Sequence, residues 1–127
     1  MTMRRLLIVD DSPLVREHVA QMMSTIPDID LVGQTETVAE SLVALRRLVP
    51  DIIILDLHLP DGDGFEILNA VKKFFPRIRV IVLTNYPFPQ HKAKALASGA
   101  EYFFDKSLEF EKLIDVLKKP IAQTIQP

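Results

Sequence analysis

Three aspartates stand directly after two short apolar runs of the chain. Asp10 and Asp11 follow the run LLIV at 6–9, and Asp56 follows the run IIIL at 52–55. If both runs are neighbouring strands, their carboxylates converge, and like charges this close raise each other's pKa unless a cation is present. Carboxylate oxygens together with water suit Mg²⁺. The pattern therefore predicts a magnesium site, and an aspartate beside Mg²⁺ can act as a nucleophile toward a phosphoryl group.

Two further polar residues follow apolar runs later in the chain. Thr84 comes after VIVL at 80–83, and Lys106 comes after EYFFD at 101–105. A hydroxyl and a compact, mobile ammonium can both donate hydrogen bonds to phosphoryl oxygens. In chain order, an acid pair, an acid, a hydroxyl and an ammonium thus supply the groups that phosphoryl transfer to a carboxylate needs.

The apolar runs predict the strands that position these groups. The runs at 6–9, 52–55 and 80–83 are continuous and rich in Ile and Val, which favours strands buried on both faces of a parallel sheet. Two weaker strands are predicted at 29–35 and 101–105, nearer the edges of the sheet.

Helical patterns fill the gaps between the strands. Ser12 with Pro13 favours a helix start, as do the pairs Thr37 with Glu40 and Asp63 with Glu66, which have the spacing of a capping box. Val15, Val19, Met22 and Ile26 recur at helical spacing. A helix over about 88–98 ends before Gly99, and Ser107 is expected to open a last helix that carries Phe110, Leu113 and Leu117.

The alternation predicts an α/β fold of the (βα)5 type. Helical crossovers between parallel strands give a doubly wound five-stranded parallel sheet, and the order 2-1-3-4-5 is the common one for a flavodoxin-like three-layer sandwich. The connections are too short for a second domain, so we expect one domain over 1–127 with its core at about 4–119. Ligands in such sheets bind where the strand order reverses, which here lies between the strands that end at Asp10 and Asp56.

Composition narrows the class of protein. The formal charge of −2 does not provide the positive field that nucleic-acid binding needs, so we expect no direct nucleic-acid contact. The chain has no cysteine, which excludes disulfides and thiolate metal sites. The apolar stretch near the N-terminus is too short for a signal peptide or a membrane span, so we expect a cytoplasmic protein without membrane contact.

The sequence resembles the receiver domain of two-component response regulators, chemotaxis receivers included, over about 4–119. The landmarks in this chain are Asp10-Asp11, Asp56 with Pro60 and Gly64 after it, Thr84, Gly99-Ala100 and Lys106. The resemblance implies that Asp56 is the phosphoacceptor and that Mg²⁺ is held by Asp10, Asp11, Asp56 and the backbone carbonyl of His58. It implies that Thr84 and Lys106 bind the phosphoryl oxygens. Thr84 and the aromatic residue three before the lysine, Phe103, would form the switch.

Three positions depart from the common family pattern. Ser107 stands where many receivers have a proline preceded by a cis peptide bond, so we expect a trans bond here. Asn85 replaces a smaller residue, which predicts narrower access to Asp56. The switch position is Phe103, while the tyrosine lies one residue earlier at Tyr102, so a switch through Tyr102 stays an alternative.

The resemblance predicts a signalling module rather than an enzyme, with at most slow autophosphatase activity. A histidine kinase or histidine phosphotransfer protein would donate the phosphoryl group, and the partner would be a protein or an output domain absent from this chain. The surface expected to change comprises the fourth helix with Tyr86, the last strand with Tyr102 and Phe103, and the last helix around Lys112 and Lys119. A homodimer on activation stays open.

The residues of this chain depart from the patterns of three alternative sites. A Mg²⁺-dependent phosphatase with an aspartyl nucleophile usually carries a second acid two residues later, and that position is His58. A flavin or nucleotide module needs a glycine-rich loop after the first strand, where this chain has DDSP. The stretch Asp61–Gly64 suggests a calcium loop, but Phe65 and Lys72 occupy positions where acids are required.

Overall fold

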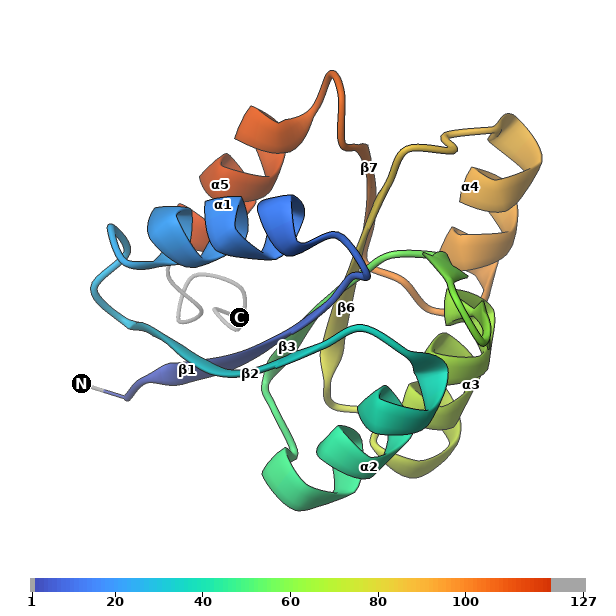
Figure 1. Ribbon diagram of the computed structural model, residues 1–127, viewed down its shortest axis with the longest axis horizontal. Helices are drawn as coiled ribbons and strands as arrows, with labels where there is room; N and C mark the ends of the chain where they lie inside the picture. The colour runs from blue at the N-terminus through green and yellow to red at the C-terminus, as the bar shows by residue number, and fades with distance from the viewer. Residues whose placement is uncertain (1, 120–127) are drawn as a thin grey trace, which may run out of the picture.

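A five-stranded parallel sheet runs through the protein in the computed structural model, which describes residues 2–119 (Figure 1). Its strands are β1 (Arg4–Val9), β2 (Ile29–Thr35), β3 (Ile52–Leu55), β6 (Arg79–Thr84) and β7 (Tyr102–Asp105). Their order across the sheet is β2-β1-β3-β6-β7, which is the predicted order 2-1-3-4-5 of the five main strands. The two strands predicted near the edges, β2 and β7, are the edge strands.

Five helices cover the two faces of this sheet. They are α1 (Pro13–Met23), α2 (Val38–Leu48), α3 (Gly64–Phe74), α4 (Pro89–Ala97) and α5 (Phe110–Lys118). Helices α1 and α5 lie on one face, and α2, α3 and α4 lie on the other (Figure 1). The predicted α/β, doubly wound, three-layer fold is therefore confirmed. No helix within residues 2–119 is long and apolar enough to cross a membrane.

The sheet separates two hydrophobic cores because neighbouring residues of a strand face opposite sides. In β1, Leu7 and Val9 pack with α2 and α3, whereas Leu6 and Ile8 pack with α1 and α5. All four side chains are completely buried. Burial on both faces explains why the central strands read as unbroken apolar runs in the sequence.

The helices α1, α2 and α3 begin where the sequence predicts. The side chains of Ser12, Thr37 and Asp63 accept hydrogen bonds from the backbone N–H groups of Val15, Glu40 and Phe65, respectively. The predicted capping box at α2 also implies a hydrogen bond from Thr37 N to the Glu40 carboxylate, and this part of the prediction is wrong. The Glu40 carboxylate accepts a hydrogen bond from Glu36 N, at 3.1 Å, one residue before the expected Thr37. Ile26 is buried, but it lies beyond the end of α1 at Met23.

The prediction that Ser107 opens the last helix is wrong. Helix α5 begins at Phe110, and residues 106–108 form a turn. Asp105 builds that turn, since its carboxylate accepts from Ser107 N at 2.8 Å and its carbonyl accepts from Glu109 N at 2.8 Å. The peptide bond after Lys106 is trans, as expected from Ser107. Lys106 is thus the first residue of a tight turn rather than the residue before a helix.

A short hairpin after β3 was not expected from the sequence. Strand β4 (His58–Leu59) pairs antiparallel with β5 (Gly62–Asp63) in the connection between β3 and α3. The loop that the Pro60 and Gly64 landmarks indicate is therefore folded back on itself directly after Asp56.

The buried side chain of Arg4 connects the first strand to the end of the last helix. Arg4, which is 3% exposed, makes an ion pair with Asp28 at 2.8 Å. Its guanidinium also donates to the carbonyls of Leu117 and Lys119 at the end of α5. These carbonyls have no partner inside the helix, so Arg4 supplies the hydrogen bonds that the helix end lacks.

Val49 ends α2 in the left-handed conformation, with φ 42° and ψ 67°, which a β-branched residue rarely adopts. We expect Val49→Gly to raise the free energy of unfolding by roughly 0.5–1 kcal/mol, because glycine removes this strain at some cost in chain entropy. Urea denaturation measures the change. The matched control is Val43→Gly, an equally exposed site inside α2, where the same substitution should lower stability by about 1 kcal/mol. Equal losses in both variants would contradict the prediction.

Candidate functional site

The predicted site lies at the carboxyl edge of the sheet, where β1 and β3 end side by side. The backbone aligns the two ends, because Asp56 N donates to the carbonyl of Val9 at 2.9 Å. Within the described residues, five polar or charged side chains are buried, and Asp10, Asp56 and Thr84 are three of them. Burying polar groups is costly unless they are paired, so their concentration at one edge marks this place as the chemical site of the fold.

Lys106 joins the two buried aspartates. Its Nζ lies 2.6 Å from Asp10 Oδ2 and 3.1 Å from Asp56 Oδ2, and its side chain is only 8% exposed. The turn that Asp105 builds carries Lys106 over the edge, and Lys106 N donates to the carbonyl of Thr84 at 2.9 Å. The structure thus brings together residues from the ends of β1, β3, β6 and β7.

The electrostatics of the cluster favour cations. Burial raises the pKa of Asp56, the positive charge of Lys106 opposes that rise, and the neighbouring charge of Asp10 adds to it, with a raised pKa as the result. Burial alone would lower the pKa of Lys106, but the hydrogen bond to Asp10 and the charge of Asp56 hold it above its ordinary value. Lys106 therefore stays protonated, and Asp56 is a carboxylate whose negative charge is poorly solvated.

The acidic residues fit a divalent cation. Asp11 joins Asp10 and Asp56, and the three residues each offer a carboxylate oxygen within 4.8 Å of the others. Asp11 is exposed, so the cluster opens to solvent on its side. One ammonium against three carboxylates leaves two negative charges uncompensated, and a hard cation with oxygen ligands would neutralise them. The donor set of this chain therefore fits Mg²⁺.

Thr84 ends β6 beside the cluster with its side chain completely buried. Its hydroxyl oxygen accepts a hydrogen bond from Tyr86 N at 3.1 Å. That bond leaves the hydroxyl proton free to donate to another oxygen. Thr84 is thereby connected to the segment that leads into α4.

The hairpin after β3 begins at the phosphoacceptor candidate itself. Asp56 Oδ1 accepts from His58 N at 3.2 Å. Gly64 closes the hairpin, since its N–H donates to the Leu57 carbonyl at 2.9 Å. A Cβ at Gly64 would lie 2.5 Å from the carbonyl oxygen of Asp56, so only glycine fits at this landmark.

Two supports of Asp10 were not predicted from the sequence. Asp10 Oδ1 accepts from Ser12 N at 2.9 Å, which the Asp-x-Ser spacing could have indicated as a turn. Arg16 on α1 donates to the Asp10 carbonyl at 2.7 Å and reaches Glu36 at 3.4 Å. A single arginine on an exposed helix carries no sequence signal for this role.

The two candidate switch residues lie on opposite faces of β7. Phe103 is 6% exposed and packs in the core with Ala95 of α4, so it does not belong to the surface that the sequence analysis assigned to it. Tyr102 packs on the α1 and α5 face, 5.5 Å from the ring of Phe104. Phe103 therefore contacts the α4 layer, and Tyr102 does not share that core.

Three aromatic side chains pack together on the segments that follow β3 and β6 and on α4. The ring of His58 lies against Tyr86, with 3.9 Å between ring centroids, and His91 of α4 is 6.4 Å from His58. Asn85, expected to narrow the access, is exposed beside this group. His58 follows Asp56 by two residues and Tyr86 follows Thr84 by two, so the contact of their rings joins the segments after β3 and β6.

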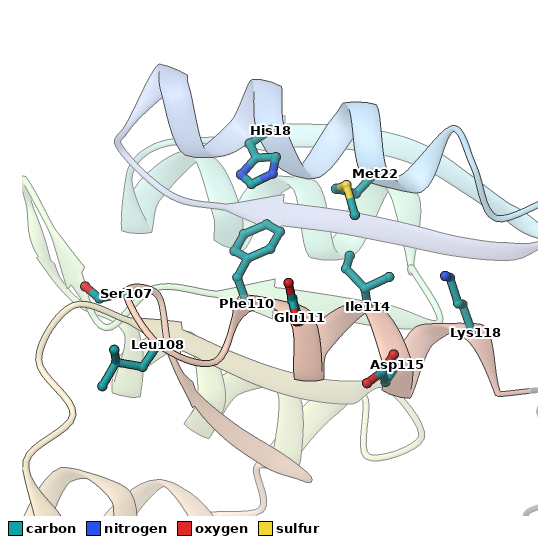
Figure 2. Close-up of a pocket in the computed structure, with 9 residues that line it drawn as sticks. All are labelled: His18, Met22, Ser107, Leu108, Phe110, Glu111, Ile114, Asp115 and Lys118. Atoms are coloured by element: carbon teal, nitrogen blue, oxygen red, sulfur yellow. The ribbon is translucent and has the colours of Figure 1, made fainter.

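A surface groove lies between α1 and α5 (Figure 2). His18 and Phe110 stack across it with their ring centroids 4.3 Å apart, and Figure 2 shows the two rings pointing toward one another. Ser107 and Leu108 line the groove and directly follow Lys106. Leu108 is 83% exposed, so its apolar side chain is open to solvent close in sequence to Lys106 of the site.

Comparison with known proteins agrees with this geometry. Residues 6–118 match the response regulator receiver domain family. The response regulator protein VraR of Staphylococcus saprophyticus is 33% identical over 115 residues, which are 91% of this chain and 55% of that protein. The chain thus spans about half the length of the curated relatives it matches.

Solved structures show the same fold. The response regulator domain of Thermotoga maritima CheB superposes with a TM-score of 0.82 at 29% identity, covering 98% of this chain and 99% of that one. RcsB, in a structure of two dimers bound to two parallel DNAs, has a TM-score of 0.85 at 26% identity, covering 91% of this chain and 59% of that one. Sequence, topology and the edge that holds Asp10, Asp56 and Lys106 lead to one conclusion: the chain belongs to the response regulator receiver domains of two-component signalling.

Proposed function

We propose that residues 1–127 form one receiver domain that accepts a phosphoryl group on Asp56 from a histidine kinase or a histidine phosphotransfer protein. The observation that carries this proposal is the position of the Asp56 carboxylate, which is buried at the end of β3 and held 3.1 Å from the ammonium of Lys106. Family membership supports the same conclusion and a cytoplasmic location.

The chemistry follows from the arrangement of the side chains. An Asp56 oxygen attacks the phosphorus of a phosphohistidine, the N–P bond breaks, and the donor imidazole leaves with the electron pair. Lys106 then pairs with a phosphoryl oxygen, and the free hydroxyl proton of Thr84 donates to another. Water later cleaves the acyl phosphate, so the domain has at most a slow autophosphatase activity rather than turnover of a substrate.

Asp10, Asp11, Asp56 and the backbone carbonyl of His58 are proposed to hold Mg²⁺. When bound, the ion would neutralise the charge on the phosphoryl oxygens during transfer. Asp10 also binds Lys106, which keeps the ammonium at the edge of the site.

Phosphorylation is proposed to reach the surface through Thr84. Because Thr84 Oγ1 accepts from Tyr86 N, a hydroxyl drawn toward the phosphoryl group pulls the start of α4 with it. Helix α4 begins at Pro89 without a side-chain cap, so few hydrogen bonds oppose the shift. Phe103 packs against α4 and would repack in response. A free-energy difference of about 1.4 kcal/mol is enough for a tenfold change between two states.

Two surfaces are proposed to bind partners, one for the phosphodonor and one for the output. The groove between α1 and α5 is lined by Ser107 and Leu108, which directly follow Lys106 in the chain, so it is proposed as the surface that binds the phosphodonor. The output surface is proposed to comprise α4 with Tyr86, Tyr102, and α5 around Lys112 and Lys119. It would regulate a partner protein, a second copy of the chain or an output domain, without direct DNA contact by this domain. The DNA-bound RcsB dimers support dimerisation as an option.

The alternatives are less well supported. His58 carries no carboxyl group for the acid–base role of an aspartyl phosphatase, and its ring packs at a tilt against Tyr86. After β1 the chain has Asp10 and Asp11 rather than a glycine-rich loop, which counts against a flavin or nucleotide ligand.

Acetyl phosphate with Mg²⁺ should add one phosphate to the intact mass of the protein, and the adduct should be labile to base as an acyl phosphate is. Asp56→Ala should show no gain, because it removes the proposed acceptor carboxylate at the end of β3, which lies against Lys106 and the acid pair. An equal gain in Asp56→Ala would sink the assignment.

Asp11→Ala should abolish Mg²⁺-dependent phosphorylation and should raise the stability of the metal-free protein, since it removes like-charge repulsion. Mg²⁺ should raise the melting temperature of the wild type and leave that of Asp11→Ala unchanged. Asp30→Ala on β2, which removes an exposed acid away from the site, is the matched control and should respond to Mg²⁺ as the wild type does. An unchanged phosphorylation rate in Asp11→Ala would show that the metal ligands are assigned wrongly.

Beryllofluoride, a phosphoryl mimic, should shift amide NMR signals at Asp56 and across residues 84–106. Thr84→Ala should keep the shifts around Asp56 and lose those in α4, because the hydroxyl that joins the site to Tyr86 is missing. Shifts confined to the Asp56 pocket in the wild type would leave the switch without support.

A further inference from the structure

The hairpin after β3 is anchored at its tip by a residue of unexplained function. Asp61 lies between β4 and β5, and both of its carboxylate oxygens accept hydrogen bonds from the start of α2. Asp61 Oδ1 accepts from Val38 N at 2.7 Å, and Oδ2 accepts from Ala39 N at 3.0 Å. A loop in the third βα connection therefore binds a helix of the second.

This contact is more than the usual cap of a helix. The first N–H groups of a helix lack partners within it, and its N-terminus carries partial positive charge. Thr37, the residue directly before α2, already caps Glu40 N at 3.1 Å. Asp61 satisfies two further N–H groups from 22 and 23 residues away. These backbone donors lower the pKa of Asp61, so the carboxylate stays charged and bound at neutral pH.

The other end of the hairpin lies in the phosphoacceptor site. His58 N donates to Asp56 Oδ1, and the carbonyl of His58 is the proposed backbone ligand of the metal. Two residue pairs, His58 with Asp63 and Leu59 with Gly62, form the hairpin, and the hydrogen bond from Gly64 N to the Leu57 carbonyl closes it. A two-stranded hairpin this short is not stable by itself, so its position depends on what anchors it.

We propose that Asp61 is a positioning residue of the phosphoacceptor site: by binding the N-terminus of α2 it fixes the hairpin and so holds the His58 backbone against Asp56. This inference rests on the proposed function of Asp56. Asp61 is an exposed acid that contacts no reacting atom. Its effect on metal binding and phosphorylation would come through the backbone of His58.

A merely structural cap makes a different prediction, and the chain offers a matched control. Asp61→Ala and Thr37→Ala each remove side-chain hydrogen bonds from the N-terminus of α2 and should each lower the melting temperature of the protein. Only Asp61→Ala releases the hairpin. A role beyond helix capping must therefore appear in Asp61→Ala and be absent from Thr37→Ala.

The test uses hydrogen exchange of the His58 amide and a Mg²⁺ titration followed by amide NMR. In Asp61→Ala, the His58 amide should exchange faster and the Mg²⁺ dissociation constant should rise roughly 10-fold, the lower end of the effect expected for loss of a residue behind a metal ligand. Phosphorylation by acetyl phosphate should slow as well. Asp61→Asn, which keeps one oxygen acceptor, should fall between wild type and Asp61→Ala, and Thr37→Ala should match wild type in all three measurements.

Equal His58 exchange in Asp61→Ala and Thr37→Ala, or equal Mg²⁺ affinity in both, would overturn the proposal and leave Asp61 as a helix cap. Failure of the proposed function has a separate signature, namely wild-type protein that gains no phosphate on Asp56. In that case the exchange rate of the His58 amide alone still decides whether Asp61 positions the hairpin.

Discussion

The ammonium of Lys106, held between the carboxylates of Asp10 and Asp56, is the interaction on which the site depends. Two strand ends and the turn after a third strand must meet to bring these groups together, and a parallel sheet does so because all its carboxyl ends lie at one edge. The ammonium makes burial of the two acids tolerable, yet one positive charge is not enough for three carboxylates. The fold thus holds its functional groups in a state that still attracts a cation.

Much of this could be predicted from the sequence, and for a physical reason. Strands buried on both faces are apolar throughout, so the runs that end at Val9, Leu55 and Leu83 identify the sheet centre. A polar residue directly after such a run must then lie at the functional edge. Asp56 and Lys106 could be assigned to one site because their positions follow from strand topology, not from any contact between them in the sequence.

The features that could not be predicted depend on contacts between distant segments. Arg4 looks like an ordinary N-terminal cation, yet it is buried against the end of α5. Asp61 belongs to a loop that composition marks only as a turn, and nothing near it indicates α2 as its partner. Ser107 has the local pattern of a helix cap, but Asp105 builds a turn first, so the competing hydrogen bonds of a neighbour decided the outcome.

The alternation of side chains along β7 has a mechanical consequence. Phe103 packs among residues of α4, and the adjacent Phe104 packs against α1 and α5 on the opposite face. Because both rings belong to one strand, a rotation of that strand about its axis moves both of them. A rotation of β7 that moved the Phe103 ring out of its layer would therefore also move the Phe104 ring in the opposite layer. Because the two hydrophobic cores share this strand, such a rotation would change the packing of both cores together.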